Sequence, residues 1–102
     1  MDKNARVSVL MSVYNGESYL REAIESILNQ NYTDFEFIII DDASTDTTPA
    51  ILDGFDGSRI IRSRNEENIG LPCSLNKGLV MARGNYIAWM AEYVNDFETP
   101  ID

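Results

Sequence analysis

Continuous runs of hydrophobic residues recur along the chain and predict its strands. The runs at residues 7–13 ("VSVLMSV") and 35–40 ("FEFIII") are rich in β-branched residues, as is typical of strands buried on both faces. A weaker run at residues 59–63 ("RIIRS") predicts a third strand nearer an edge of the sheet. Residues 86–90 ("YIAWM") predict the fourth strand.

Between these runs, apolar residues recur at helical spacing. The spacing predicts a helix from about Ser18 to Asn29, with one apolar stripe. A short second helix is expected around Pro49, because proline is tolerated only in the first turn of a helix. A third helix should begin near Pro72, direct Leu75, Leu79 and Ala82 inward, and stop at Gly84.

Strand and helix therefore alternate through the whole sequence. This order predicts an α/β fold of Rossmann-like type, a three-layer α/β/α sandwich with a mainly parallel sheet of about four strands and three helices. Ligands of such sheets bind beyond the carboxyl ends of the strands. Any chemistry is thus expected in four loops, at residues 12–17, 41–46 and 63–70 and after Met90.

The composition limits the possible partners. With 102 residues, 44% hydrophobic and 25% charged, the chain is expected to form one globular domain over residues 1–102. Its net charge of −9 disfavours binding to nucleic acid or to anionic membranes. A phosphate ligand would need a local cation, a helix N-terminus or a metal ion.

The chain has one cysteine, Cys73, and no histidine. It therefore forms no internal disulfide, and zinc sites and Ser-His-Asp triads are excluded within it. Cys73 itself is expected to be a small buried residue or a helix-start residue. The run at residues 7–13 is too short to span a bilayer and lacks the layout of a secretory signal, so the predicted location is the cytoplasm.

The first loop, "SVYNGES", has two interpretations. In the structural one, Asn15-Gly16 supplies positive φ for a turn and Ser18 caps the following helix. In the functional one, Tyr14 offers its ring as a stacking platform for a planar base. The spacing alone does not separate them.

Two adjacent carboxylates, Asp41 and Asp42, follow the second strand and are the stronger signal. Either could cap the next helix, but Ser44, Thr45 and Asp46 already compete for that role. A carboxylate in this place can accept a hydrogen bond from a nucleobase N–H or a ribose hydroxyl. We therefore expect at least one of the two to bind ligand.

The sequence contains no glycine-rich phosphate loop of either standard pattern. A divalent cation would then be the natural clamp for a diphosphate. Arg62 and Arg64 are the nearest cations, and they either contact phosphate or are solvated and balanced by acidic neighbours, Glu66 and Glu67. Lys77 is expected to be a solvated surface residue.

From about Val7 to Met90 the sequence resembles the N-terminal, nucleotide-sugar-binding half of a family 2 glycosyltransferase of the GT-A fold. The combination of motifs that carries the resemblance is specific: "VSVLMSVYN", "SILNQNY", "IDDASTD" and "NIGLPCSLNKGLVMARGNYI". The resemblance implies transfer of a sugar from a nucleoside diphosphate, often UDP, to an acceptor hydroxyl.

The resemblance also assigns residues. Ser12 and Tyr14 would line the base pocket, with Asn15 beside them, and Asp42 would accept from the base N–H. Asp41 would support the loop or the ribose. The loop from Arg64 to Asn68 would border the ribose and the phosphates.

The chain departs from the family pattern after the fourth strand. There the family has an Asp-rich motif that holds Mn²⁺ or Mg²⁺, but the matching positions read Ala91, Glu92 and Tyr93, and only an unaligned Asp96 follows. No metal ligand and no catalytic residue is therefore assigned. A family domain also continues well beyond 102 residues, so a short or truncated form, inactive on its own, is expected.

Two other classes of protein are alternatives. A non-catalytic nucleotide-binding or assembly module would associate with itself through the fourth strand, where Ile87 and Trp89 lack neighbouring strands. A phospho-receiver domain would need an aspartate at the end of the third strand, and "IIRSR" has none. The sugar, the acceptor and the base stay unassigned.

Overall fold

The computed structural model describes residues 7–29, 34–55, 57 and 59–89. Strand and helix alternate through them, as the hydrophobic pattern predicts. The elements are β1 (Val7–Val13), α1 (Leu20–Leu28), β2 (Phe35–Asp41), α2 (Thr48–Asp53), β3 (Ile60–Arg64), α3 (Leu71–Met81) and β4 (Tyr86–Trp89).

The four strands form one parallel sheet in the order β3-β2-β1-β4. The two most apolar strands, β1 and β2, take the centre because there both faces of a strand are covered. The predicted third strand lies at one edge, as expected, and β4 lies at the other. The fold is thus of the predicted α/β class.

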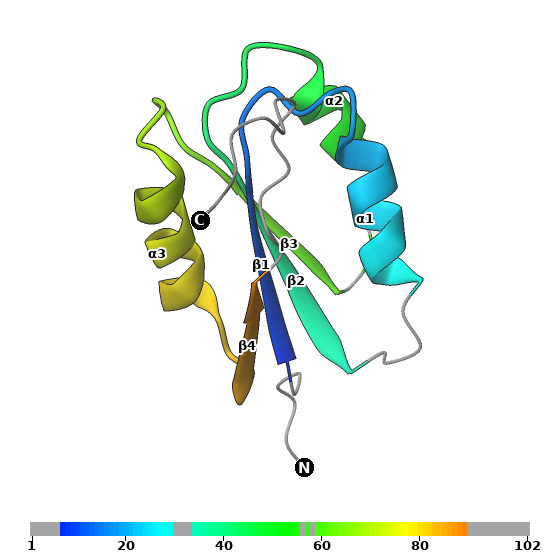
Figure 1. Ribbon diagram of the computed structural model, residues 1–102, viewed down its shortest axis with the longest axis vertical. Helices are drawn as coiled ribbons and strands as arrows, with labels where there is room; N and C mark the ends of the chain where they lie inside the picture. The colour runs from blue at the N-terminus through cyan, green and yellow to red at the C-terminus, as the bar shows by residue number, and fades with distance from the viewer. Residues whose placement is uncertain (1–6, 30–33, 56, 58, 90–102) are drawn as a thin grey trace, which may run out of the picture.

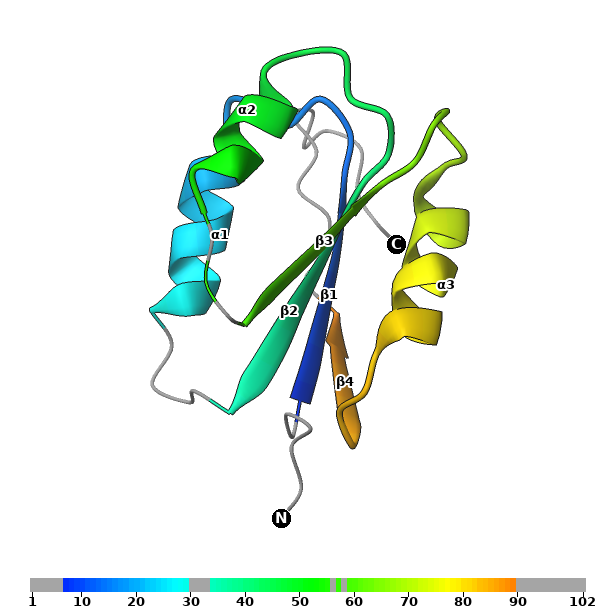
Figure 2. The ribbon, with the colours of Figure 1, turned by 180° about the vertical axis from the view of Figure 1, so that it is seen from behind.

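Helices cover both faces of the sheet. Helices α1 and α2 lie on one side and α3 lies on the other (Figures 1 and 2). The larger core is between the sheet and α1 and α2, and its fully buried members include Met11, Leu20, Ile24, Phe37 and Ile39. Burial of side chains of this size stabilises the fold by roughly 1.5–3 kcal/mol each.

A smaller core lies between the sheet and α3. Leu10, Ile38 and Ile40 are buried there, and Leu75 and Ala82 pack against them as predicted. Leu79, however, is 41% exposed, so its predicted inward orientation is wrong. Gly78 is buried against the sheet instead, where an added Cβ would lie at ordinary contact distance, 3.6 Å, from Ile40 and Leu10.

Helix α1 starts later than predicted. The Tyr19 and Leu20 N–H groups donate to the Gly16 carbonyl oxygen at 3.0 and 2.8 Å, which forms a turn before the helix begins. Tyr19 is the N-cap residue and makes no side-chain cap, so the structural role proposed for Ser18 as the cap is wrong.

The end of α3 also differs from the prediction. The helix ends at Met81, and Ala82 is already extended (φ −68°, ψ 140°), so Gly84 is not its stop. A side chain on Gly84 would lie 2.8 Å from the Ser8 nitrogen. Gly84 therefore allows the α3–β4 turn to pass close to β1.

The predicted fourth strand is confirmed over Tyr86–Trp89, and Met90 lies outside the described residues. All four of its residues are exposed. In the part of the chain that the structure describes, no helix is both long and apolar enough to cross a membrane.

Candidate functional site at the carboxyl edge of the sheet

The loops after β1, β2 and β3 lie side by side, because the strands that they follow are in register. Val13 pairs with Asp41, and Asp41 pairs with Arg64. The Asp42 N–H donates to the Val13 carbonyl at 2.8 Å, and the Asn65 N–H donates to the Asp41 carbonyl at 2.9 Å. Three of the four loops predicted to carry the chemistry thus meet at one edge. The loop after Met90 lies outside the described residues.

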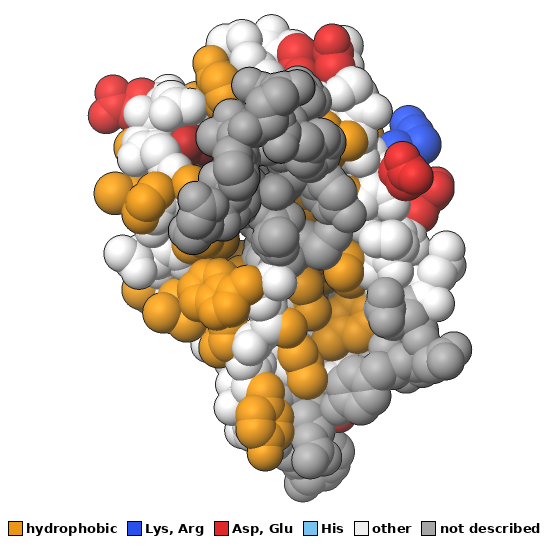
Figure 3. Space-filling model, in the orientation of Figure 1, with side chains coloured by type: hydrophobic (Ala, Val, Ile, Leu, Met, Phe, Trp, Pro, Cys, Tyr) orange, Lys and Arg blue, Asp and Glu red, His pale blue; other side chains and the backbone are white. Residues whose placement is uncertain are grey.

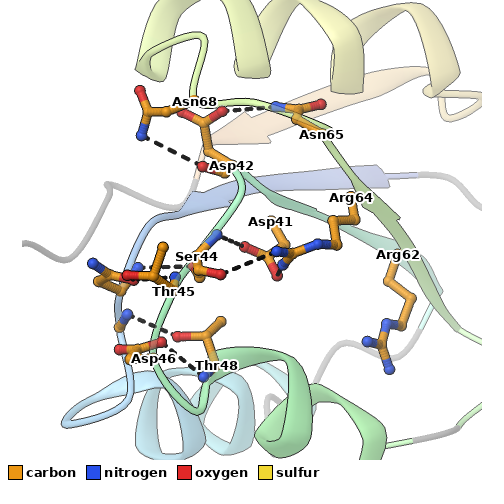
Figure 4. A network of polar contacts seen from close by, with 12 residues as sticks. Asp41, Asp42, Ser44, Thr45, Asp46, Thr48, Arg62, Arg64, Asn65 and Asn68 are labelled. Carbon is orange, nitrogen blue, oxygen red and sulfur yellow. Dashed lines mark hydrogen bonds and ion pairs between the residues drawn. The ribbon is translucent and has the colours of Figure 1, made fainter.

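Asp41 and Asp42 point to opposite faces of the sheet. Successive residues of a strand alternate between faces, and Ile39, two residues before Asp41, belongs to the core under α1 and α2. Ile40, two residues before Asp42, belongs to the core under α3. Figure 4 shows the two carboxylates directed to different partners. They are therefore two sites and not a carboxylate pair.

Asp41 is 2% exposed and forms an ion pair with Arg64. The Arg64 Nη1 lies 2.6 Å from Asp41 Oδ2, and its Nη2 donates to the Ser44 carbonyl at 3.0 Å (Figure 4). The other Asp41 oxygen accepts from the Ser44 N–H at 3.0 Å. Arg64 is thus neutralised by Asp41, and its side chain is still half exposed at the edge.

Arg62 has a different acidic partner from those that the sequence suggested. Its Nη1 lies 2.7 Å from Asp53 Oδ1, in an exposed ion pair on the face of the sheet that α2 covers. The prediction that Glu66 and Glu67 balance the charges of the two arginines is therefore wrong. The register of β3 explains the difference, because it sets Arg64 beside Asp41.

Asp42 is also 2% exposed, and it organises the β3–α3 loop. Its Oδ1 accepts from Asn65 Nδ2 at 2.9 Å (Figure 4) and from the Ile69 N–H at 2.8 Å. Its Oδ2 accepts from the Gly70 N–H at 2.9 Å. Gly70 has φ 92°, a left-handed conformation that favours glycine. One carboxylate thus holds both ends of residues 65–70.

These hydrogen bonds determine the charge state of Asp42. Burial raises the pKa of its carboxyl, but the donors from Ile69, Asn65 and Gly70 outweigh burial, so the pKa is below its ordinary value of 3.8. Asp42 is therefore an anion at neutral pH.

A polar network continues behind Asp42 into α3. Asn65 is 4% exposed, and its Nδ2 also donates to the Ser74 hydroxyl at 3.0 Å. Its Oδ1 accepts from Lys77 Nζ at 2.5 Å. The prediction that Lys77 is a solvated surface residue is thus wrong. Its partner Asn65 lies twelve residues away on another element, where sequence spacing gives no signal.

The β1–α1 loop is fastened to the β2–α2 loop through hydrogen bonds. The N–H groups of Asn15, Gly16 and Glu17 donate to side chains of the second loop at 2.8, 2.9 and 3.2 Å; the acceptors are Ser44 Oγ, Thr48 Oγ1 and Asp46 Oδ2. In return, Asn15 Oδ1 accepts from the Thr45 N–H at 2.7 Å. Asn15 has φ 53°, as its turn interpretation predicts, whereas Gly16, the other residue of the predicted pair, does not have positive φ.

Asp46 joins this contact to α2. Its Oδ1 accepts from the Thr48 N–H at 2.8 Å at the start of the helix, while its Oδ2 accepts from Glu17. Burial raises the pKa of Asp46, but the hydrogen bonds from Thr48 and Glu17 outweigh it and hold the pKa below 3.8. The sequence suggested that residues 44–46 cap the second helix. Asp46 binds the start of that helix and also binds the β1–α1 loop.

These bonds occupy backbone donors at the starts of all three helices. Gly16 and Glu17 precede α1, Thr48 begins α2, and Gly70 is the N-cap of α3. Free N–H groups at a helix N-terminus are what make it an anion site. Since protein side chains already accept from these four groups, none of them is free to donate to a phosphate.

The remaining predicted site residues line the same edge. Tyr14 directly follows β1 and is 47% exposed, so its ring is open to a ligand. Ser12 is buried in β1 opposite Ile40, on the α3 side. Asn68 is exposed in the β3–α3 loop, and its Nδ2 lies 3.4 Å from the Asp42 carbonyl. The edge thus brings together all seven: Ser12, Tyr14, Asn15, Asp41, Asp42, Arg64 and Asn68.

The described residues do not fit the divalent cation that the family resemblance implies. Among them, no group of three or more acidic, cysteine or histidine side chains is placed to hold a metal. The carboxylates of Asp41 and Asp42 lie on different faces and already accept from protein donors. Ala91 to Tyr93 and Asp96 lie outside the described residues.

Several residues of the site were missed by sequence reasoning. Asn65 donates to Asp42, while Ser74 and Lys77 bond to Asn65, and Glu17 accepts from Thr47 Oγ1 at 2.6 Å. Asn65 and Glu17 lie in loops expected to carry the site, whereas the positions of Ser74 and Lys77 within α3 gave no signal. Cys73 is exposed near the start of α3, so it is a helix-start residue and not a buried one.

Comparison with known sequences identifies the family. The family model described as "Glycosyl transferase family 2" matches residues 8–91. An uncharacterized glycosyltransferase of Methanocaldococcus jannaschii is 46% identical over 92 residues, which cover 86% of this chain and 31% of that protein. The chain spans about a third of the length of the first curated relatives that it matches.

Solved structures share the fold. Staphylococcus aureus TarS (residues 1–349) in complex with UDP has a TM-score of 0.79 at 30% identity, over 85% of this chain and 27% of that one. Mannosyltransferase PcManGT of Pyrobaculum calidifontis, in complex with GDP-Man and Mn²⁺, has a TM-score of 0.74 at 27% identity, over 82% and 26%. With the family model covering most of the sequence, this chain belongs to glycosyl transferase family 2.

Proposed function

We propose that residues 1–102 form a nucleotide-sugar-binding domain, which binds the nucleoside part of a nucleoside-diphosphate sugar, with UDP-sugar as the leading donor. The main support is the open ring of Tyr14 at the end of β1, between loops that are fixed to each other. Two of the similar structures are complexes, one with UDP and one with GDP-Man and Mn²⁺.

The seven site residues divide into two groups in this proposal. Tyr14 stacks on the base, while the exposed Asn68, on the α3 side, faces its edge and the ribose, with the buried Ser12 beneath. Asn15, Asp41 and Asp42 act mainly through neighbours, because their side chains already bond to protein donors. Arg64, half exposed, is the cation that reaches the phosphate side.

The diphosphate contributes less to binding than the nucleoside in this proposal. The four backbone donors at the helix starts are occupied, and Arg64 is already paired with Asp41. A net charge of −9 also opposes a dianionic ligand. UDP and uridine should thus bind to these 102 residues with similar affinity.

Transfer of the sugar to an acceptor hydroxyl is the activity that family membership suggests for the whole protein. We assign no catalytic residue, and we propose that these 102 residues alone do not catalyse transfer, because Ala91, Glu92 and Tyr93 stand where the family motif has aspartates. A cytoplasmic location fits the free, exposed thiol of Cys73.

Calorimetric titration with UDP, with and without Mn²⁺, tests the binding. Tyr14→Ala should lower UDP affinity by about 5- to 150-fold, because stacking of a base on an aromatic ring contributes about 1–3 kcal/mol. Tyr86→Ala removes another exposed ring, on β4 and away from the carboxyl edge, and should leave UDP binding unchanged. Wild-type protein that binds no UDP at millimolar concentration would refute the proposal, and Tyr14→Ala with wild-type affinity would refute stacking.

A second candidate function is self-assembly through β4. Hydrophobic side chains gather on the face over α3 and β4 (Figure 3). The exposed large hydrophobic residues of these two elements are Leu79, Val80, Tyr86, Ile87 and Trp89. An exposed apolar edge strand commonly pairs with another chain. Light scattering at tens of micromolar should then give the mass of a dimer, and a monomer mass would contradict this candidate.

A further inference from the structure

Asn65 occupies an unusual place, with a carboxylate on one side and an ammonium group on the other. Its amide nitrogen donates to Asp42 Oδ1 at 2.9 Å, and its amide oxygen accepts from Lys77 Nζ at 2.5 Å. A carboxylate only accepts and an ammonium only donates. The amide satisfies both partners in one orientation only, so Lys77 and Asp42 together fix it.

The same network balances the charge at the edge of the sheet. Asp41 is neutralised by direct contact with Arg64. Asp42 is equally buried, and its link to a cation runs through Asn65 to Lys77. A buried charge is costly unless it is compensated, so the two carboxylates have separate cations on opposite faces.

The position of Asp42 controls the loop that faces the ligand. Its two oxygens hold the Ile69 and Gly70 N–H groups, which directly follow Asn68. Ser74, in the first turns of α3, accepts from Asn65 and ties the helix to the same network. Consecutive hydrogen bonds thus link Lys77 through Asn65 and Asp42 to the backbone of Ile69 and Gly70.

We propose that Asn65 and Lys77 are positioning residues of the nucleotide site: Lys77 orients the Asn65 amide, which orients Asp42 and with it the loop at residues 68–70. Lys77 itself touches no ligand in this proposal. The ligand part of the inference rests on the proposed function, whereas the positioning of the loop does not.

The test is Lys77→Met, with hydrogen exchange and UDP titration as separate measurements. Exchange at the Ile69 and Gly70 amides should become about tenfold faster, because Asn65, which holds Asp42, loses its hydrogen bond to the charged Lys77. UDP affinity should fall by a similar factor. Lys77→Arg, which keeps a charged donor, should restore both.

Arg83→Met is the matched control, since it also removes one cation, from an exposed side chain at the α3–β4 turn. It should change neither measurement. Exchange at Ile69 and Gly70 that stays at the wild-type rate in Lys77→Met would overturn the proposal. Equal acceleration of exchange at the core amides of Leu10 and Ile38 would also overturn the proposal, because that pattern indicates a general loss of stability.

The two proposals fail in different ways. If wild-type protein binds no UDP, the proposed function is wrong and the ligand part of this inference falls with it. The exchange comparison still decides whether Lys77 positions the loop. If wild-type protein binds UDP and Lys77→Met binds it equally well, only the positioning role is overturned.

Discussion

Asp41 and Asp42 are adjacent and equally buried, but Asp41 binds Arg64 and Ser44 whereas Asp42 binds the β3–α3 loop. Their place after a buried strand predicted that at least one would bind ligand, which stays a prediction; in the structure both are buried and accept hydrogen bonds from protein donors. Their partners were not predictable, because Arg64 reaches Asp41 from the end of β3, and Asn65 and Gly70 reach Asp42 from the β3–α3 loop. Strand alternation, a local rule, already implied that the two side chains would separate.

Ala43 lies between these aspartates and Ser44 in the left-handed region, with φ 65°. This conformation costs an alanine about 1–2 kcal/mol, whereas glycine adopts it freely but loses about 0.5–1 kcal/mol more entropy on folding. Ala43→Gly should therefore raise the free energy of unfolding by about 0.5–1 kcal/mol in urea denaturation.

Ala50→Gly is its control, because Ala50 is an exposed residue inside helix α2. There the same exchange should destabilise the protein by about 1 kcal/mol. A loss of stability in Ala43→Gly similar to that in the control would contradict strain at Ala43.

Asp46 makes stability depend on pH. Because its pKa in the folded protein is below 3.8, its contribution is fully present above about pH 4 and is lost as the pH falls through the folded pKa. Asp46→Ala should cost about 1 kcal/mol at pH 7, the usual effect of losing a helix cap. The difference in unfolding free energy from wild type should shrink between pH 4 and pH 3.

Asp53→Ala removes an aspartate from an exposed ion pair with Arg62, and should cost less than about 0.5 kcal/mol at pH 7. A difference between wild type and Asp46→Ala that stays constant down to pH 3 would contradict the role assigned to the Asp46 carboxylate.

At the scale of elements, the sequence predicted which strands and helices exist better than where they end. The apolar runs determine β1 and β2, since only a central strand tolerates so many buried residues. The ends depend on tertiary contacts. Helix α1 begins only after the turn at Gly16. Helix α3 ends before Gly84, because the chain must pass close to Ser8 there.

Helix α3 allows a direct test of this distinction. A side chain on Gly78 would meet Ile40, Leu10 and Ile38 at 3.6–3.7 Å, ordinary contact distances. Gly78→Ala should therefore stabilise the protein by up to about 1 kcal/mol through helix propensity.

Gly84→Ala should destabilise the protein, because its side chain would lie 2.8 Å from the backbone of Ser8 and Val7. Thermal denaturation of both variants measures the two effects. The account of α3 would be wrong if Gly78→Ala lowered the melting temperature as much as Gly84→Ala does.

At the scale of the whole molecule, alternation of strand and helix was enough to predict a parallel sheet with helices on both faces and a site at its carboxyl edge. It was not enough to predict how the loops of that edge hold one another. The bonds of Asn15, Gly16 and Glu17 to the β2–α2 loop join residues about thirty positions apart. Such contacts follow from the register of the sheet, which periodicity does not encode.

The central claim, nucleotide binding at this edge, is tested most directly by following assigned backbone amide signals in NMR spectra during titration with UDP. The account predicts shifts at residues 13–17, 42–46 and 64–70, and unchanged signals at residues 82–86 at the opposite end of the sheet. No shifts at millimolar UDP, or the largest shifts at residues 82–86, would contradict it.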